Sequence, residues 1–316
     1  MNIKKKYGRY RICVAKKTVH IKKANSLKTN VLKAAFMKKY LWEIGSTIRI
    51  YFMNKPVGIE RKSYNDLKRE VNANNIDPLQ KEVDKMTIIN SVKKIITERY
   101  AKFLNLKFIF VDDMEQSDIR INFNADDGCW SYIGTDCLNV SYKNKPTMNF
   151  AWFDVSTIMH EFGHALGMIH EHQNPYNNQI LWNKKKVYEW AKDTQGWSKH
   201  ATDVNILDMP TEEINGSEYD PFSIMLYFYP PELTTDDKGT NENLKLSPMD
   251  VFFLNKMYPG SEETPHEFYK NAYGEDIDEK QLSLKSATTN FIKNYSLYII
   301  IQIIILLIII IIVFRK

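Results

Sequence analysis

The sequence HEFGHALGMIH occupies residues 160–170, and the spacing of its three histidines decides how the rest of the chain is interpreted. On a helix, residues four apart share one face, so His160 and His164 can present imidazole nitrogens to a single metal ion. A straight helix would carry His170 away from that ion. Gly167 can adopt positive φ and end the helix, which lets the chain turn back and deliver His170.

The residue types of this motif predict a catalytic zinc site. Three neutral imidazoles with one position left open are typical of catalytic Zn²⁺, whereas four protein ligands are typical of structural Zn²⁺. Glu161 can reach a metal-bound water without becoming a ligand itself. The alternative is an amphipathic core helix that carries histidines by chance. It is disfavoured because three of the seven histidines fall in this frame. We therefore predict one Zn²⁺ per chain on His160, His164 and His170.

The residues around the motif complete the expected site. Asp154, Ser156 and Thr157 are candidate N-caps for the helix, whose apolar positions would face a core. Pro175 excludes further helix soon after the motif. His172 could serve as a fourth ligand, but a closed site would exclude water, so we expect it beside the ligands or at the surface.

Hydrophobic periodicity predicts several further elements between residues 41 and 259. Alternating apolar residues indicate strands, and apolar residues recurring on one stripe indicate helices. Residues 54–84 are charged and rich in asparagine, and we interpret them as a surface insertion. The expected strands cover residues 47–52, 107–111 and 119–123. One expected helix ends near Phe103, and another covers residues 183–193.

Charge is unevenly spread along the 316 residues, although the net charge is only +5. Residues 1–40 hold thirteen Lys and Arg and no Asp or Glu, so the remainder is mildly acidic. A basic arm could touch nucleic acid or an anionic membrane. We favour a solvated extension and expect no nucleic-acid partner. The apolar run within it is too short for a secretory signal.

Cysteine usage is too sparse for a disulfide scaffold. The chain has three cysteines, Cys13, Cys129 and Cys137. Cys129 and Cys137 are near enough in sequence to bridge one loop, and Cys13 would then be left over. The spacing alone leaves that bridge open.

A second stretch, YDPFSIMLY at residues 219–227, makes the resemblance to a known family specific. The zinc motif has the long metzincin form, and SIMLY at residues 223–227 is similar to the Met-turn of the astacin-like branch. Glu171 directly after the third histidine, WSYIG at residues 130–134 and LSPMD at residues 246–250 also resemble that branch. The resemblance covers residues 41–259.

The resemblance implies an α+β fold and a metalloendopeptidase activity. A twisted, mostly parallel five-stranded sheet would carry two helices, with the zinc helix at the floor of the cleft and a smaller C-terminal lobe. Residues 141–150 would line the cleft as an edge strand to which peptide substrates add through backbone hydrogen bonds.

The resemblance also implies roles for single residues. Met225 would form an apolar floor beneath the histidines, and Tyr227 would contact the metal at rest and later the tetrahedral intermediate. Glu161 would be the general base. Glu171 matches a residue that contacts the new N-terminus of activated members. Typical members are secreted and have a propeptide and two disulfides, for which this chain has too few cysteines.

The end of the sequence predicts a membrane anchor. Residues 297–314 are apolar except for Gln302, and eighteen helical residues span ~27 Å. We expect a membrane-spanning helix over residues 296–314 and a stalk over residues 260–295. With no signal segment we expect the catalytic domain on the cytosolic side, although the sequons at Asn139 and Asn215 point the other way.

Two other functions are compatible with parts of the sequence. The domain could be a catalytically silent zinc-binding protein, but Glu161, the three histidines and Tyr227 are all in place. It could be mainly a structural membrane protein. The sequence indicates neither the oligomeric state nor the substrate.

Overall fold

The computed structural model describes residues 14–16, 36–175, 178–209, 214–215, 218–278 and residue 282. Chain contacts divide the protein into a unit of residues 1–276 and a unit of residues 277–316. The predicted anchor at residues 296–314 lies outside the described residues. Among the described residues, no helix is long and apolar enough to cross a membrane.

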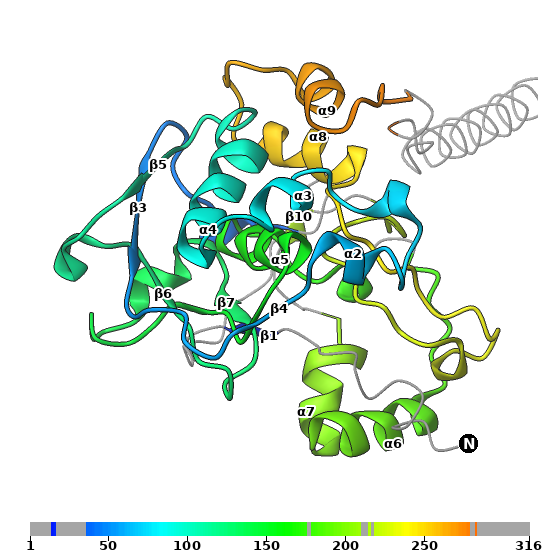
Figure 1. Ribbon diagram of the computed structural model, residues 1–316. Coiled ribbons are helices and arrows are strands. Elements are labelled where there is room, and N and C mark those ends of the chain that lie inside the picture. Colours follow the sequence, from blue (N-terminus) through cyan, green and yellow to red (C-terminus); the bar gives the residue numbers. More distant parts are fainter. Residues whose placement is uncertain are drawn as a thin grey trace, which may run out of the picture. The chain divides into compact units, whose positions relative to one another are not determined.

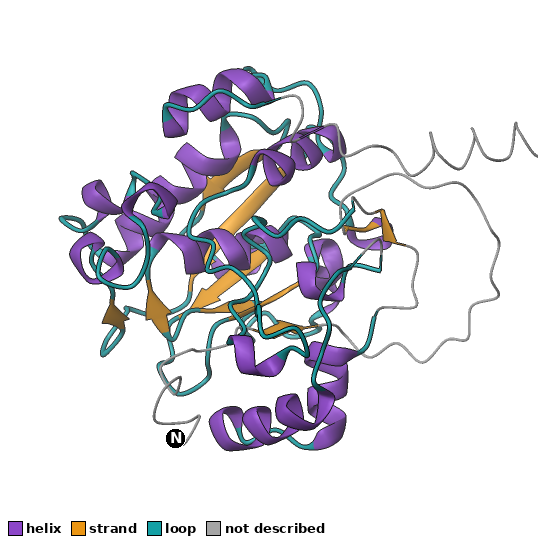
Figure 2. Cartoon of the chain, turned by 90° about the vertical axis from the view of Figure 1, so that its right-hand side faces the viewer, coloured by secondary structure: helices purple, strands orange, loops and turns teal. Residues whose placement is uncertain are grey.

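A six-stranded, mostly parallel sheet forms the main layer of the first unit (Figure 1, Figure 2). The order is β5-β3-β6-β8-β7-β1, and β7 pairs antiparallel with β8. The other described pairings of this sheet are parallel, so β7 and β1 run opposite to the other four strands. The remaining strands form two small pairs, β2 with β10 and β4 with β9. The strands are β1 (Val14–Lys16), β2 (Phe36–Met37), β3 (Thr47–Phe52), β4 (Glu60–Arg61), β5 (Lys107–Phe110), β6 (Ile119–Asn122), β7 (Trp130–Tyr132), β8 (Met148–Asn149), β9 (Trp152–Phe153) and β10 (Ile214–Asn215).

Helices α4 and α5 pack against each other (Figure 1). Tyr100, in the π-helical turn that continues α4, donates its hydroxyl to the Met159 carbonyl of α5 at 2.6 Å. The α-helices within the described residues are α2 (Tyr64–Leu67), α3 (Gln80–Val83), α4 (Ile88–Ile96), α5 (Val155–Ala165), α6 (Lys184–Gln195), α7 (Lys199–Thr202), α8 (Pro248–Met257) and α9 (Pro265–Tyr273).

The sheet contains a strand that the resemblance did not imply. β1 comes from the N-terminal extension and pairs in parallel with β7, with Lys16 opposite Tyr132. The Lys16 ammonium lies 3.3 Å from the centroid of the Trp130 ring, a cation–π contact. The expected five-stranded sheet is therefore wrong by one strand, because a short run in a basic arm gives no strand signal of its own.

The strand expected at residues 141–150 differs in length and place. Only Met148–Asn149 forms a strand, β8, and it is paired with β6 on one side and β7 on the other. An incoming peptide needs unpaired backbone groups at a sheet edge. β8 therefore cannot receive a substrate edgewise, and this prediction is wrong.

The expected surface insertion at residues 54–84 contributes to the core. It contains β4, α2 and α3, and the side chains of Leu67, Ile76 and Val83 are buried. Two polar side chains of this segment are also fully buried, Asp77 and Gln80. Asp77 forms an ion pair with Arg99 at 2.7 Å, which explains how a carboxylate is accommodated there.

The expected stalk begins too early at residue 260. Residues 265–273 form α9, which packs against α8. Its Phe268 is buried, with its ring centroid 4.3 Å from that of Phe103. The first unit therefore extends past residue 259 to the end of α9.

Candidate metal centre

The helix that carries the first two histidines is fixed at its N-terminus by two side chains. Asp154 is the N-cap and accepts a hydrogen bond from the Thr157 amide at 2.8 Å. Gln80 accepts the Val155 amide at 2.8 Å. Amides in the first turn of a helix have no partner within it, so these bonds satisfy groups that would otherwise be buried without one.

The other end of α5 turns sharply at Gly167, as predicted. Gly167 has φ of +98°, its amide bonds to the His164 carbonyl at 2.8 Å, and the Met168 amide bonds to the Gly163 carbonyl at 2.9 Å. This pair of bonds is a Schellman motif, in which a glycine ends a helix by adopting positive φ. The turn brings His170 back towards His164.

Two aromatic side chains hold the last carbonyls of α5. The Trp42 indole donates to the Ala165 carbonyl at 2.7 Å, and the Tyr258 hydroxyl donates to the Leu166 carbonyl at 2.7 Å. The Tyr258 hydroxyl also accepts the Trp42 amide at 3.4 Å, across 216 residues of sequence. The turn that leads to His170 is therefore held by one residue that precedes α5 in the sequence and by one that follows it.

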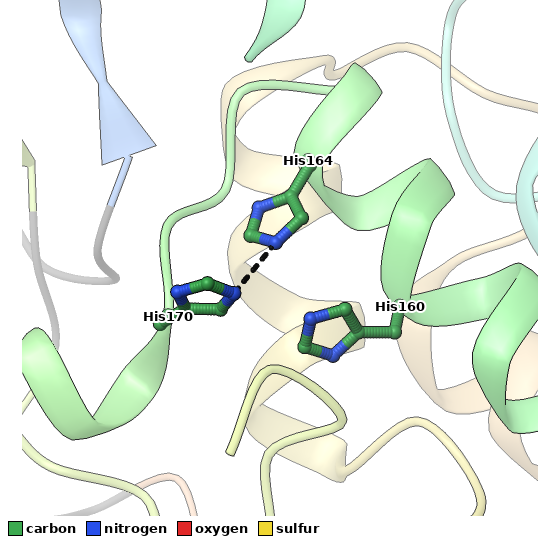
Figure 3. Close-up of side chains that lie close together, drawn as sticks. All are labelled: His160, His164 and His170. Atoms are coloured by element: carbon green, nitrogen blue, oxygen red, sulfur yellow. Dashed lines mark hydrogen bonds between the residues drawn. The ribbon is translucent and has the colours of Figure 1, made fainter. Parts of the chain in front are cut away.

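The three predicted histidines come together (Figure 3). One nitrogen of each of His160, His164 and His170 lies within 4.8 Å of the others, and the Nε2 atoms of His164 and His170 are 2.9 Å apart. Tetrahedral zinc with Zn–N bonds of about 2.0–2.1 Å needs nitrogens roughly 3.3 Å apart. The His164–His170 pair is close to this spacing, and three imidazole nitrogens are a donor set typical of catalytic Zn²⁺.

Hydrogen bonds on the far side of the rings leave Nε2 for a metal. His160 Nδ1 lies 2.8 Å from the Ile224 carbonyl, and His164 Nδ1 lies 2.9 Å from the Met168 carbonyl. A carbonyl can only accept, so each Nδ1 carries the proton and each Nε2 keeps its lone pair. Burial lowers the pKa of His160 to about 4 and that of His170 well below its usual value. The rings of His160 and His170 are therefore neutral, as metal ligands must be.

Tyr227 places its hydroxyl at the same point. The oxygen lies 3.2 Å from His160 Nε2 and 2.5 Å from His170 Nε2. The side chain is buried, with 8% of its surface exposed. The predicted neighbour of the metal is therefore in contact with two of the three candidate ligands.

Two further predicted residues, Glu161 and Met225, are both fully buried. Met225 Sδ is so close to Gly163 that a Cβ there would lie only 2.5 Å from it. Met225 therefore packs directly against the helix between the two histidine positions. Gly163 was not singled out from the sequence, because a helical glycine signals close approach only once its neighbour is known.

The residues after the third histidine link the site to other segments. The Glu171 amide donates to the Met225 carbonyl at 3.0 Å, and the Glu171 carboxylate accepts from the Asp220 amide and the Asn174 side chain, both at 2.8 Å. His172 is buried with its Nε2 3.0 Å from the Asn205 carbonyl. His172 is therefore not part of the metal cluster, as predicted, and it is not at the surface.

The two neighbouring cysteines do not form the bridge that the sequence left open. Cys129 and Cys137 are free, buried thiols. Burial raises the pKa of the Cys137 thiol to about 12, so this group stays protonated at neutral pH. Cys13 lies outside the described residues.

Comparison with known proteins now identifies the family. The sequence model of the peptidase family Astacin matches residues 77–259, more than half of the chain. The chain belongs to the astacin family. The resemblance that the sequence indicated is therefore confirmed, and the three predicted histidines form the candidate metal cluster.

Individual relatives agree with this placement. The chain is 32% identical over 155 residues to blastula protease 10 of Paracentrotus lividus, covering 44% of this chain and 23% of that protein. It is 30% identical over 113 residues to astacin-like metalloprotease toxin 5 of Loxosceles gaucho, covering 35% and 53%. The astacin-like chain thus spans about half or less of the length of these relatives.

The solved structure of myroilysin is similar over a larger share of this chain. It shares 31% sequence identity, with a TM-score of 0.56, and the match covers 72% of this chain and all of that one. The similarity supports the predicted fold, a mostly parallel sheet with helices, for the astacin-like part of the chain.

Proposed function

We propose that this astacin-family chain is a zinc-dependent endopeptidase that hydrolyses internal peptide bonds of protein or peptide substrates. The observation that carries the proposal is the convergence of three histidine nitrogens within 4.8 Å. Two of these rings are held in the required tautomer by backbone carbonyls. Family membership supports the same activity.

The chain's own groups can be given roles in this reaction. His160, His164 and His170 would hold the zinc ion. When bound, zinc polarises the scissile carbonyl and activates a water molecule. Glu161 would act as the general base, taking the proton from the attacking water at its carboxylate and passing it to the leaving amine. Its position next to His160 and its complete burial support this role.

Tyr227 would stabilise the oxyanion that develops on the substrate. Its hydroxyl lies beside two candidate ligands, so it can donate a hydrogen bond where negative charge accumulates. Donors fixed in advance at such a point usually make one of the largest contributions to catalysis.

The experiment that tests the activity is cleavage of a denatured protein such as casein. We expect Glu161→Gln to keep one zinc per chain and to lose about 10²- to 10⁴-fold in rate, the usual contribution of a general base. The exposed Glu115→Gln is the matched control and should cleave at the wild-type rate. Undiminished cleavage by Glu161→Gln would refute the assignment.

We further propose that residues 296–314 anchor the chain in a membrane, with the catalytic domain facing the cytosol. The support is the apolar sequence of residues 297–314, broken only by Gln302. Alkaline extraction should leave the full chain in the membrane and release a chain that ends after residue 278. Digestion in sealed vesicles tests the side, since a cytosolic domain is cut without detergent. Protection of the domain, or glycosylation at Asn139, would contradict this orientation.

A further inference from the structure

A continuous path of hydrogen bonds leads away from the first candidate ligand. His160 donates from Nδ1 to the Ile224 carbonyl at 2.8 Å. That carbonyl and the Met225 amide belong to one peptide group, and the amide donates to Ser223 Oγ at 3.0 Å. Ser223 Oγ in turn donates to Asp250 Oδ1 at 2.7 Å. The path therefore connects an imidazole to a carboxylate through one peptide group and one hydroxyl.

Every donor in this path points the same way, from His160 towards Asp250. Hydrogen bonds arranged head to tail polarise one another, so the carboxylate strengthens each bond before it. In many metal sites a carboxylate accepts directly from the ligating histidine, which fixes the ring and raises the basicity of its other nitrogen. Here the same arrangement is extended by two intervening groups.

The carboxylate itself is held rigidly. Asp250 Oδ2 accepts hydrogen bonds from the Ile224 amide at 2.8 Å and the Ser247 amide at 3.0 Å. Asp250 is the N3 residue of the capping box that begins α8 at its N-cap, Ser247. Ser223, Ile224 and Asp250 are all at most 3% exposed. Water therefore does not compete for these bonds, and the low local dielectric strengthens them.

We propose that Asp250 is a positioning residue for the zinc site, which acts through Ser223 and the peptide group between Ile224 and Met225. It holds His160 with its proton on Nδ1 and makes Nε2 a stronger metal ligand. The proposal rests on the zinc site of the proposed function. It assigns to helix α8, which carries Asp250, an influence on the metal beyond packing.

Ser223→Ala is the variant that isolates this path. It removes the hydroxyl but leaves both bonds to Asp250 Oδ2 in place, so the cap of α8 remains. We expect zinc to dissociate about 10- to 100-fold faster in chelator competition, the usual effect of removing an outer partner of a metal-bound histidine. We also expect a shifted visible spectrum when Co²⁺ replaces zinc, because the spectrum reports on the ligand field.

Asp250→Asn is the second variant, and it should change both readouts in the same direction. Because the two residues act in series, the double variant should lose zinc little faster than the more affected single variant. Thr264→Ala is the matched control. It removes a hydroxyl from the capping box of α9, which among the described residues has no hydrogen-bonded path to the histidines. It should lower stability and leave the dissociation rate and the spectrum unchanged.

The outcomes separate this proposal from the proposed function. A wild-type rate and spectrum for Ser223→Ala would overturn the path through Asp250 while the peptidase activity still stands. Independent, additive losses in the double variant would also overturn it, since they show two separate packing effects. Failure of the wild-type chain to bind zinc would overturn the proposed function itself.

Discussion

At the scale of single residues, Gly163 occupies a position in the candidate site where Met225 leaves no room for a side chain. A Cβ at this position would lie 2.5 Å from Met225 Sδ. Gly→Ala inside a helix ordinarily stabilises a protein by about 1 kcal/mol. Here the added methyl group must push the sulfur or the helix, and overpacking of that kind costs about 1–3 kcal/mol.

We therefore predict that Gly163→Ala lowers the free energy of unfolding and weakens zinc binding. Urea unfolding and chelator competition would measure the two effects. The control combines Gly163→Ala with Met225→Ala, which removes the opposing sulfur. The double variant should lose less free energy of unfolding than the sum of the two single variants. A stabilised Gly163→Ala protein would show that Met225 does not pack against this glycine.

A second residue-scale prediction concerns the pH dependence that Asp250 confers. Burial and the charge of Asp220 raise the pKa of Asp250 from 3.8 to about 7. Below about pH 3.8 the group is protonated in both states. Between about pH 3.8 and 7 the unfolded chain has lost the proton that the folded chain keeps, so rising pH favours unfolding. Above about pH 7 the effect is constant.

Replacing this carboxyl should remove that dependence. Relative to the wild-type protein, Asp250→Asn should gain stability as the pH rises from about 4 to 7, measured by urea unfolding of the metal-free proteins. Asp66 is the matched control, because the same capping-box position in α2 is half exposed and hydrogen bonds from Ser63 lower its pKa. Asp66→Asn should differ from wild type with the opposite slope, and only as the pH falls towards 4. Equal slopes for the two variants would contradict the prediction.

At the scale of elements, short-range patterns were predicted well and long-range partners were not. The strand at residues 47–52 and the turn at Gly167 follow from the residues within them, so the sequence alone predicts both. The partners of β8 depend on β6 and β7, which are distant in sequence. Residues 54–84 are rich in charged residues and asparagine, so their buried side chains were not expected. Helix α9 lies beyond residue 259, where the resemblance ends, so its packing on α8 was not expected either.

The three candidate ligands could be predicted because helix geometry and one glycine relate them locally. Asp250 could not be given its place in the site from the sequence. It follows Ser223 by 27 residues, and only the folded chain brings its carboxylate to the hydroxyl. Gln80 was missed for a related reason, since a polar residue in a polar segment does not indicate burial.

Gln80 provides an element-scale prediction for the segment at residues 54–84. Gln80→Ala removes the acceptor of the Val155 amide and leaves a buried donor unsatisfied at the start of α5. We expect a loss of about 1–3 kcal/mol in the free energy of unfolding, measured with urea. Gln116→Ala, at an exposed glutamine, is the control and should have little effect. Equal stabilities would mean that this segment does not support the zinc helix.

At the scale of the whole molecule, zinc should act as a stabilising ligand. Any ligand that binds only the folded state raises the free energy of unfolding, by about 4 kcal/mol at a thousand times its dissociation constant. We predict this increase for the wild-type protein on addition of zinc. His164→Ala should lose most of it, because two ligands remain from the cluster. Thermal unfolding with and without zinc gives the measurement.

His200→Ala controls for the loss of a histidine as such. His200 is exposed in α7 and is not in the metal cluster. This variant should keep the full response to zinc. An undiminished response in His164→Ala would place the bound metal elsewhere on the chain.

The bonds of Trp42 and Tyr258 to the last carbonyls of α5 have a consequence for how the protein is made. Trp42 precedes α5 and Tyr258 follows it, 216 residues apart in the sequence, so the turn before His170 gains its final support only when both have been synthesised. Contacts between distant parts of a sequence form later than local ones. We therefore expect a chain still emerging from the ribosome to bind metal weakly, and the full affinity to be reached only after Tyr258 has been synthesised.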